Sequence, residues 1–275
     1  MTSRLAGVRI IARNELHQLI KSKDYWIPLV LLGSLFFVII PGILMVIITK
    51  STNTAVVQQA SQALSVLPES AVSKIRGDTP QARTAYALAV YLFAPVACVV
   101  PLTISTAVGA ASLVGERERG TGEFLAHSPA SAREIYTGKL VASFIPGYVT
   151  TLVGFTLYSI MVNLFVGPSV GGFFFPTVEW LVMMFWVIPA FLLLTLSLVL
   201  RLSARVRSTA AAQQASGLVT LPVIGISYAQ ASGTLLGGGR YSGVIVGSVV
   251  WIIAAVSLHR GVSSVTRNRL LGVAQ

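Results

Sequence analysis

The sequence has few charged residues, a single cysteine and only three histidines. Charged side chains make up 11% of the 275 residues, whereas soluble domains average about 25%. This deficit excludes an ordinary soluble enzyme and a disordered chain. Because Cys98 is the single cysteine, neither an intrachain disulfide nor a cysteine metal cluster is possible, and it lies in an apolar run. A polytopic membrane protein is the class that remains, and 54% of its residues are hydrophobic.

Long uncharged runs divide the chain into membrane-spanning segments. A bilayer core of about 30 Å needs about 20 apolar residues per helix. The run 140–178 exceeds one crossing, and its glycines and prolines between 167 and 176 predict an interfacial turn. We therefore predict an all-α membrane protein with six spans, within the runs 27–48, 84–115, 140–178, 180–200, 210–236 and 243–258.

The basic residues are distributed unevenly between the two sides that six spans define. The termini and the loops on their side hold about three times as many lysines and arginines as the other side, with Lys139 counted in a loop. The positive-inside rule then predicts cytoplasmic termini in the inner or plasma membrane. The net charge of +11 is explained by anionic lipid headgroups, without a nucleic-acid partner.

Residues 1–24 have the pattern of an amphipathic helix. Apolar residues recur every three or four positions, and most basic residues lie off that stripe, which predicts a helix in the inner membrane interface. The alternative is an ordinary soluble cap on the first span. The stripe consists of Leu5, Val8, Ala12, Leu16 and Leu19.

The sequence offers no enzyme motif. Neither H-E-x-x-H nor C-x-x-C occurs, and Gly138-Lys139 lacks the upstream glycine and the following serine or threonine of a phosphate-binding loop. We expect no ATP hydrolysis by this chain alone and no cofactor bound to it. Glu179 lies at the edge of a span, where a solvated position is favoured over a substrate contact.

The segment 115–139 is the charge-rich part of the chain, with four of its nine acidic residues. Thr121 can cap a short helix that contains Phe124 and that Pro129 ends. Ser131 and Glu134 have the spacing of a capping box for the next helix. A short apolar helix among charges suits docking into a soluble partner, although a solvated loop with helix caps would have the same pattern.

The run E-R-E-R-G-T-x-E-F-L, followed by S-P-x-S-x-x-E-I-x-x-G-K-L, resembles the cytoplasmic loop of ABC-2 type transporter permeases. Glu116, Glu118, Gly120, Thr121 and Glu123 match the family motif, and Gly122 departs from its usual leucine. A glycine there loosens the short helix by about 1 kcal/mol. The resemblance extends over the whole chain and implies one permease domain, 1–275, with the type V exporter-like fold.

The resemblance also implies partners. The loop would be the coupling helix, seated on a separate ATP-binding cassette (ABC) ATPase subunit that holds ATP and magnesium, and a second permease copy or a homologue would complete the transporter. The implied ATPase-coupling residues are Glu116, Arg117, Glu118, Arg119, Gly120, Thr121, Glu123, Phe124 and Leu125.

Two further segments are candidates for the transport pathway. Polar residues on roughly one face of the fifth predicted span could line the pathway or hydrogen-bond neighbouring helices. They are Gln213, Ser216, Thr220, Ser227 and Gln230. The segment 51–83 between the first two spans is polar and helix-compatible, and could form an outer cap or gate.

These patterns favour the permease of an ATP-driven exporter of a small amphipathic compound or drug. Lipid, glycan or sodium-ion export is the alternative within the class. A secondary carrier would need intramembrane ionisable groups or an inverted repeat, and neither is visible. A non-transporting membrane protein that binds a cytoplasmic ATPase is the rival from another class.

Overall fold

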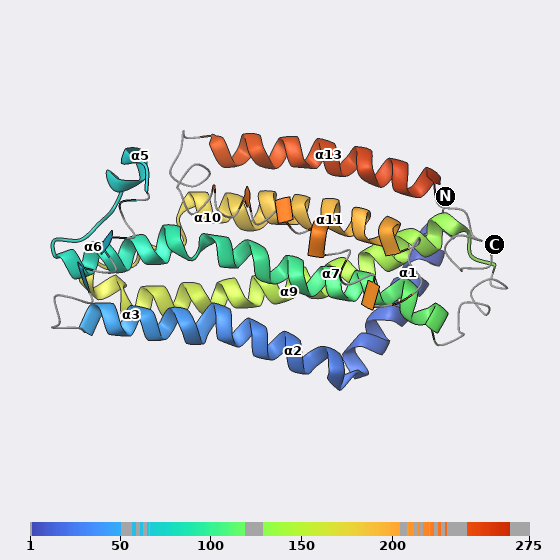
Figure 1. Ribbon diagram of the computed structural model, residues 1–275, viewed down its shortest axis with the longest axis horizontal. Coiled ribbons are helices and arrows are strands. Elements are labelled where there is room, and N and C mark those ends of the chain that lie inside the picture. The colour runs from blue at the N-terminus through green and yellow to red at the C-terminus, as the bar shows by residue number, and fades with distance from the viewer. Residues whose placement is uncertain are drawn as a thin grey trace.

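Five long apolar helices lie side by side along the molecule (Figure 1). The structure is a computed structural model that describes residues 2–50, 57–58, 61–62, 65, 67–118, 129–203, 208, 210–211, 214, 217–219, 221–222, 225–226, 229 and 241–264. Within these residues, five helices are long and apolar enough to cross a membrane. They are Tyr25–Lys50, Pro80–Ser112, Ala132–Phe165, Val178–Ser203 and Ser242–Ser263.

Short elements join into these spans. The elements in chain order are α1 (Thr2–Lys21), α2 (Lys23–Ser34), η1 (Leu35–Ile39), α3 (Ile40–Lys50), α5 (Glu69–Val72), α6 (Pro80–Ala87), η3 (Leu88–Leu92), α7 (Ala94–Glu118), α9 (Ala132–Phe165), η4 (Gly167–Ser169), α10 (Val178–Val182), η5 (Met183–Val187), α11 (Ile188–Ser203) and α13 (Ser242–Ser264). Helix α1 crosses one end of the bundle, which we name the α1 end, and α5 lies at the other, the far end (Figure 1).

Helices α11 and α13 are neighbours that run in the same direction. The indole of Trp251 donates to the carbonyl of Trp186 at 3.1 Å, and the hydroxyls of Ser257 and Ser197 are 2.6 Å apart. Since residue numbers rise together along both helices, they run parallel, and both end at the α1 end. Helix α13 therefore begins at the far end, opposite to where α11 stops.

The predicted spans agree with the structure in five places and differ at the helix starts. The fifth predicted span, 210–236, lies largely outside the described residues. The third helix begins at Ala132, after the cap that the sequence predicts at Ser131 and before the uncharged run that starts at residue 140. The second begins at Pro80, where the Thr79 hydroxyl accepts from the amide of Ala82 at 3.2 Å.

The turn predicted between residues 167 and 176 is confirmed. Helix α9 ends at Phe165, and Gly171 and Gly172 adopt φ of 93° and 117°, a region that favours glycine. Asn163 holds the returning chain, because its Oδ1 accepts from the amides of Phe174 and Phe175 at 3.0 and 3.1 Å.

Three of the described spans contain a π-helical turn, and each turn is followed by proline. The turns Leu35–Ile39, Leu88–Leu92 and Met183–Val187 precede Pro41, Pro95 and Pro189 by two or three residues. Proline has no N–H and its ring displaces the carbonyl four residues earlier, so the preceding turn widens. Phe93, for example, donates five residues back to the carbonyl of Leu88.

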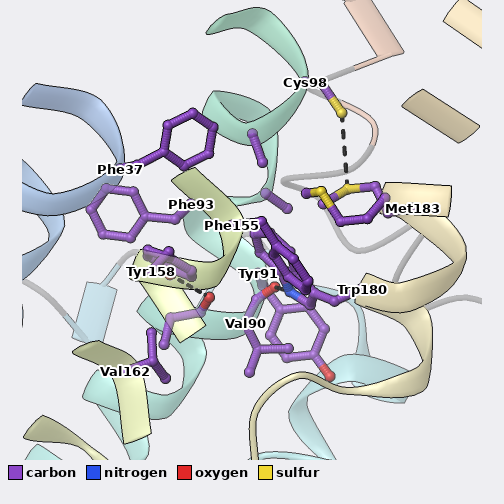
Figure 2. Close-up of a cluster of buried hydrophobic side chains, with 14 of the residues drawn as sticks. Phe37, Val90, Tyr91, Phe93, Cys98, Phe155, Tyr158, Val162, Trp180 and Met183 are labelled. Carbon is purple, nitrogen blue, oxygen red and sulfur yellow. Dashed lines mark hydrogen bonds between the residues drawn. The ribbon is translucent and has the colours of Figure 1, made fainter. Parts of the chain in front are cut away.

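Carbonyls in the π turn Leu88–Leu92 accept hydrogen bonds from aromatic side chains of neighbouring helices. The Tyr158 hydroxyl donates to Ala89 at 2.7 Å and the Trp180 indole donates to Val90 at 2.8 Å. Trp180 also stacks on Phe155 at 5.9 Å between ring centroids, inside the aromatic cluster of Figure 2. Without water in the bilayer core, backbone groups that leave the helical pattern need such partners. The cluster thereby joins the second, third and fourth described spans.

Candidate coupling site at the α1 end

The predicted coupling loop is flanked by two helices that reach the same end of the bundle. Helix α7 ends at Glu118 and α9 begins at Ala132, and α1 packs across the start of α9 (Figure 1). Residues 119–128 of the loop lie outside the described residues. A protein bound to this loop would therefore lie next to α1 and at the ends of the two spans that contain α7 and α9.

The predicted capping box at the start of α9 is confirmed. The Ser131 amide donates to Glu134 Oε2 at 2.7 Å, and the Glu134 amide donates to Ser131 Oγ at 3.3 Å. The reciprocal pair satisfies two amides at the helix start. Gly7 of α1 lies against the same carboxylate, since a Cβ on it would be 2.9 Å from Glu134 Oε1. Helix α1 thus rests on the first turn of α9.

A buried ion pair joins α1, α7 and α9 one turn further on. The ammonium of Lys139 is 2.5 Å from Glu15 Oε1 of α1 and donates to the Ser112 carbonyl of α7 at 2.8 Å. The Lys139 side chain has no exposed surface, and that of Glu15 retains 18%. Hydrogen bonds between ionised groups are about twice as strong as those between neutral groups, and a fully buried ammonium needs such partners.

The burial of Lys139 corrects its sequence-based placement in a cytoplasmic loop. Lys139 belongs to the second turn of α9, so it does not contribute to the positive charge of a loop. Its partner Glu15 is 124 residues away in the chain, and only the structure brings the two together.

The start of α9 also contacts the last two spans. The Tyr136 hydroxyl donates to the Ser197 carbonyl of α11 at 3.2 Å. Gly261 of α13 lies against the same tyrosine, since a Cβ there would be 2.5 Å from the hydroxyl oxygen. Gly138 allows α1 to approach, because a Cβ there would be 2.7 Å from Ile11 Cγ2. A displacement of this part of α9 would therefore be transmitted to α1, α7, α11 and α13.

The other predicted site residues are placed only in part. The backbone of Glu116, Arg117 and Glu118 forms the last turn of α7. Outside the described residues lie Arg119, Gly120, Thr121, Glu123, Phe124, Leu125 and the five pathway residues Gln213, Ser216, Thr220, Ser227 and Gln230.

At the far end, Glu179 is half-exposed and pairs with Lys74 at 3.3 Å. This ion pair ties the segment after α5 to the start of α10, and most of the outer segment's first half lies outside the described residues. The position of Glu179 fits the solvated role expected of it.

A cavity of about 510 Å³ with mixed lining lies between α1, α2 and α7. Its walls are mainly apolar, but Glu15, Gln18, Ser22 and Thr103 also line it. The hydroxyl oxygens of two lining residues, Tyr25 and Ser112, are buried and have no hydrogen-bond partner among the described residues. A ligand with both apolar and hydrogen-bonding groups would match these walls.

The five apolar helices and their arrangement define a multi-pass, all-helical membrane protein. A family model described as "ABC-2 family transporter protein" matches residues 9–229, and the chain therefore belongs to the ABC-2 family of transporter permeases. Its proteins are membrane permeases of ABC transporters, which typically pair with ABC ATPase subunits. No curated protein matches the chain.

Proposed function

We propose that this chain is the permease subunit of an ATP-driven exporter, powered by a separate ABC ATPase that docks on the loop 116–125. The observation that carries the proposal is the convergence of the ends of α7 and α9 with α1 through the Lys139–Glu15 ion pair. An ATPase that moves the loop would displace all three segments together, since they are joined by buried charge and close packing. ATP and magnesium belong to the partner in this proposal.

A sixth span in 210–236 and cytoplasmic termini are parts of the proposal. Helix α11 ends at the α1 end while the parallel α13 begins at the far end, so the chain between them has to pass from one end to the other. The uneven distribution of basic residues favours the α1 end as the cytoplasmic one. Two permease copies, each with an ATPase, would form the working unit.

The proposed cargo is a small amphipathic compound. The mixed cavity between α1, α2 and α7 supports this choice, because its size is within the range of small-molecule sites and its unpartnered hydroxyls can hydrogen-bond a ligand. Export of lipid, glycan or sodium ions is the second candidate, to be separated by the compound that is transported.

The test uses the chain co-expressed with an ABC ATPase and reconstituted in vesicles. We expect Glu118→Ala and Phe124→Ala to weaken ATPase binding, the latter by about thirtyfold if Phe124 is a buried anchor. Glu69→Ala, at an exposed position of the far end, is the matched control and should bind and transport normally. Normal ATP-dependent transport in both loop variants would refute the proposal. An ATPase complex without transport of any compound would favour the non-transporting alternative.

A further inference from the structure

Two cavities join along the side of the bundle where α1 meets α2 and α9. One, of about 410 Å³, lies between α2 and α9, and the other, of about 510 Å³, follows α1. Leu16, Ile20 and Ile145 line both, so the two form one continuous groove. We name it the α1–α9 groove. It adjoins the mixed cavity between α1, α2 and α7, with which it shares the lining residues Leu19, Tyr25 and Leu29.

The part between α2 and α9 is apolar and open to the side. Leu29, Val30 and Leu157 line it, together with Val149 and Val153, which are 50% and 55% exposed. In a membrane-spanning chain, these exposed valines face hydrocarbon rather than water. The shape and chemistry of this part suit one acyl chain lying along α9.

Trp26 lies where the apolar part of the groove meets the part along α1. Its indole donates to the carbonyl of Ile20 at 2.8 Å, which fixes the ring at the joint between α1 and α2. Tryptophan favours the headgroup level of a membrane, where its ring is apolar on one side and hydrogen-bonded on the other. The apolar part of the groove then lies at acyl-chain depth, and the part along α1 lies at the headgroups.

The headgroup part carries positive charge. Arg9 and Arg13 line it, are exposed, and stand four residues apart on one face of α1. Like charges at this spacing repel, and neither guanidinium forms an ion pair with another described residue. No acidic residue is among the described residues that line this part of the groove, since Glu15 faces Lys139 instead. A phosphate between the two guanidiniums would relieve the repulsion, and arginine binds phosphate through paired N–H groups.

We infer that the α1–α9 groove binds one anionic phospholipid, with its phosphate on Arg9 and Arg13 and an acyl chain between α2 and α9. The two guanidiniums select the anionic headgroup over a zwitterionic one, because they would repel the quaternary ammonium that accompanies the phosphate of the latter. A lipid held on both α1 and α9 would stabilise the packing of α1, beyond any role in moving cargo.

Native mass spectrometry of the purified full chain, incubated with equal amounts of phosphatidylglycerol and phosphatidylcholine, tests the inference. We expect the wild type to retain one phosphatidylglycerol in preference to phosphatidylcholine. Arg9→Gln/Arg13→Gln should lower this retention on the order of thirtyfold, and Arg9→Lys/Arg13→Lys should keep most of it. Arg133→Gln/Arg260→Gln removes the same charge from two exposed arginines outside the groove and should retain the lipid.

A second pair of variants tests the acyl-chain part. Val153→Trp fills the groove and should lower retention, whereas Ile160→Trp, at a position of α9 that is 60% exposed outside the groove, should not. Equal loss in both arginine pairs would overturn the inference by attributing retention to net charge alone. Equal retention of the two lipids, or unchanged retention in Arg9→Gln/Arg13→Gln, would also overturn it. ATPase docking does not enter this experiment, so its result is independent of the proposed function.

Discussion

Loss of the Lys139 ammonium should destabilise the α1 end more than any other single loss of charge described here. In Lys139→Met the Glu15 carboxylate keeps only 18% exposure without its cation, and the Ser112 carbonyl loses its donor. Removing one partner of a buried ion pair costs about 3–5 kcal/mol, and the partial exposure of Glu15 favours the lower end of that range. At about 2–4 °C per kcal/mol for chains of this size, Tm should fall by about 6–12 °C.

The double variant Glu15→Gln/Lys139→Met removes both charges and should recover most of this loss, since neutral replacement of a buried pair is often tolerated. The chain supplies its own control in the half-exposed Lys74–Glu179 pair, where Lys74→Met should cost at most about 1 kcal/mol. Thermal unfolding of the purified chain in detergent, followed by tryptophan fluorescence, measures all three. The reasoning is refuted if the double variant loses as much stability as Lys139→Met alone, or if Lys74→Met loses as much as Lys139→Met.

Two further predictions concern packing and the π turns. Gly138→Ala should displace α1, because the new Cβ would be 2.7 Å from Ile11. The sensitivity of α1 to protease should then rise. The control Gly33→Ala, whose new Cβ has its nearest contact at 3.6 Å, should leave the protease sensitivity of α1 unchanged. Tyr158→Phe leaves the buried Ala89 carbonyl without the hydroxyl that donates to it at 2.7 Å. The variant should lose about 1–2 kcal/mol of stability, measured in the same melting assay. An unchanged Tm would mean that the carbonyl finds another donor.

The sequence predicts the spans because lipid imposes one strong requirement on them. A helix that crosses hydrocarbon has to be long and uncharged, so runs such as 27–48 stand out without knowledge of their neighbours. The turn after α9 and the cap at Ser131 were predictable for a similar reason, since both depend on residues close together in the chain. These are local determinants.

The candidate site was harder to predict from the sequence. Lys139 looks like a loop lysine because it precedes an apolar run, and its burial depends on Glu15, which is distant in the chain. The partners of the π-turn carbonyls are equally remote, as with Trp180 and Val90. A local signal for the turns existed nonetheless: proline two or three residues after each of them.

The π turn at Leu88–Leu92 holds one residue more than an ordinary helical turn. Each residue of an α-helix advances the chain by about 100°. Deleting one residue within the π turn would convert it to ordinary helix and leave α7 facing nearly the same way. Deleting one residue of α7 between this turn and Ser112 would instead rotate the rest of α7 by about that angle, so that the Ser112 carbonyl would point away from Lys139. Natural variation in the length of this span should therefore be concentrated at the π turn and avoid the helix that follows it.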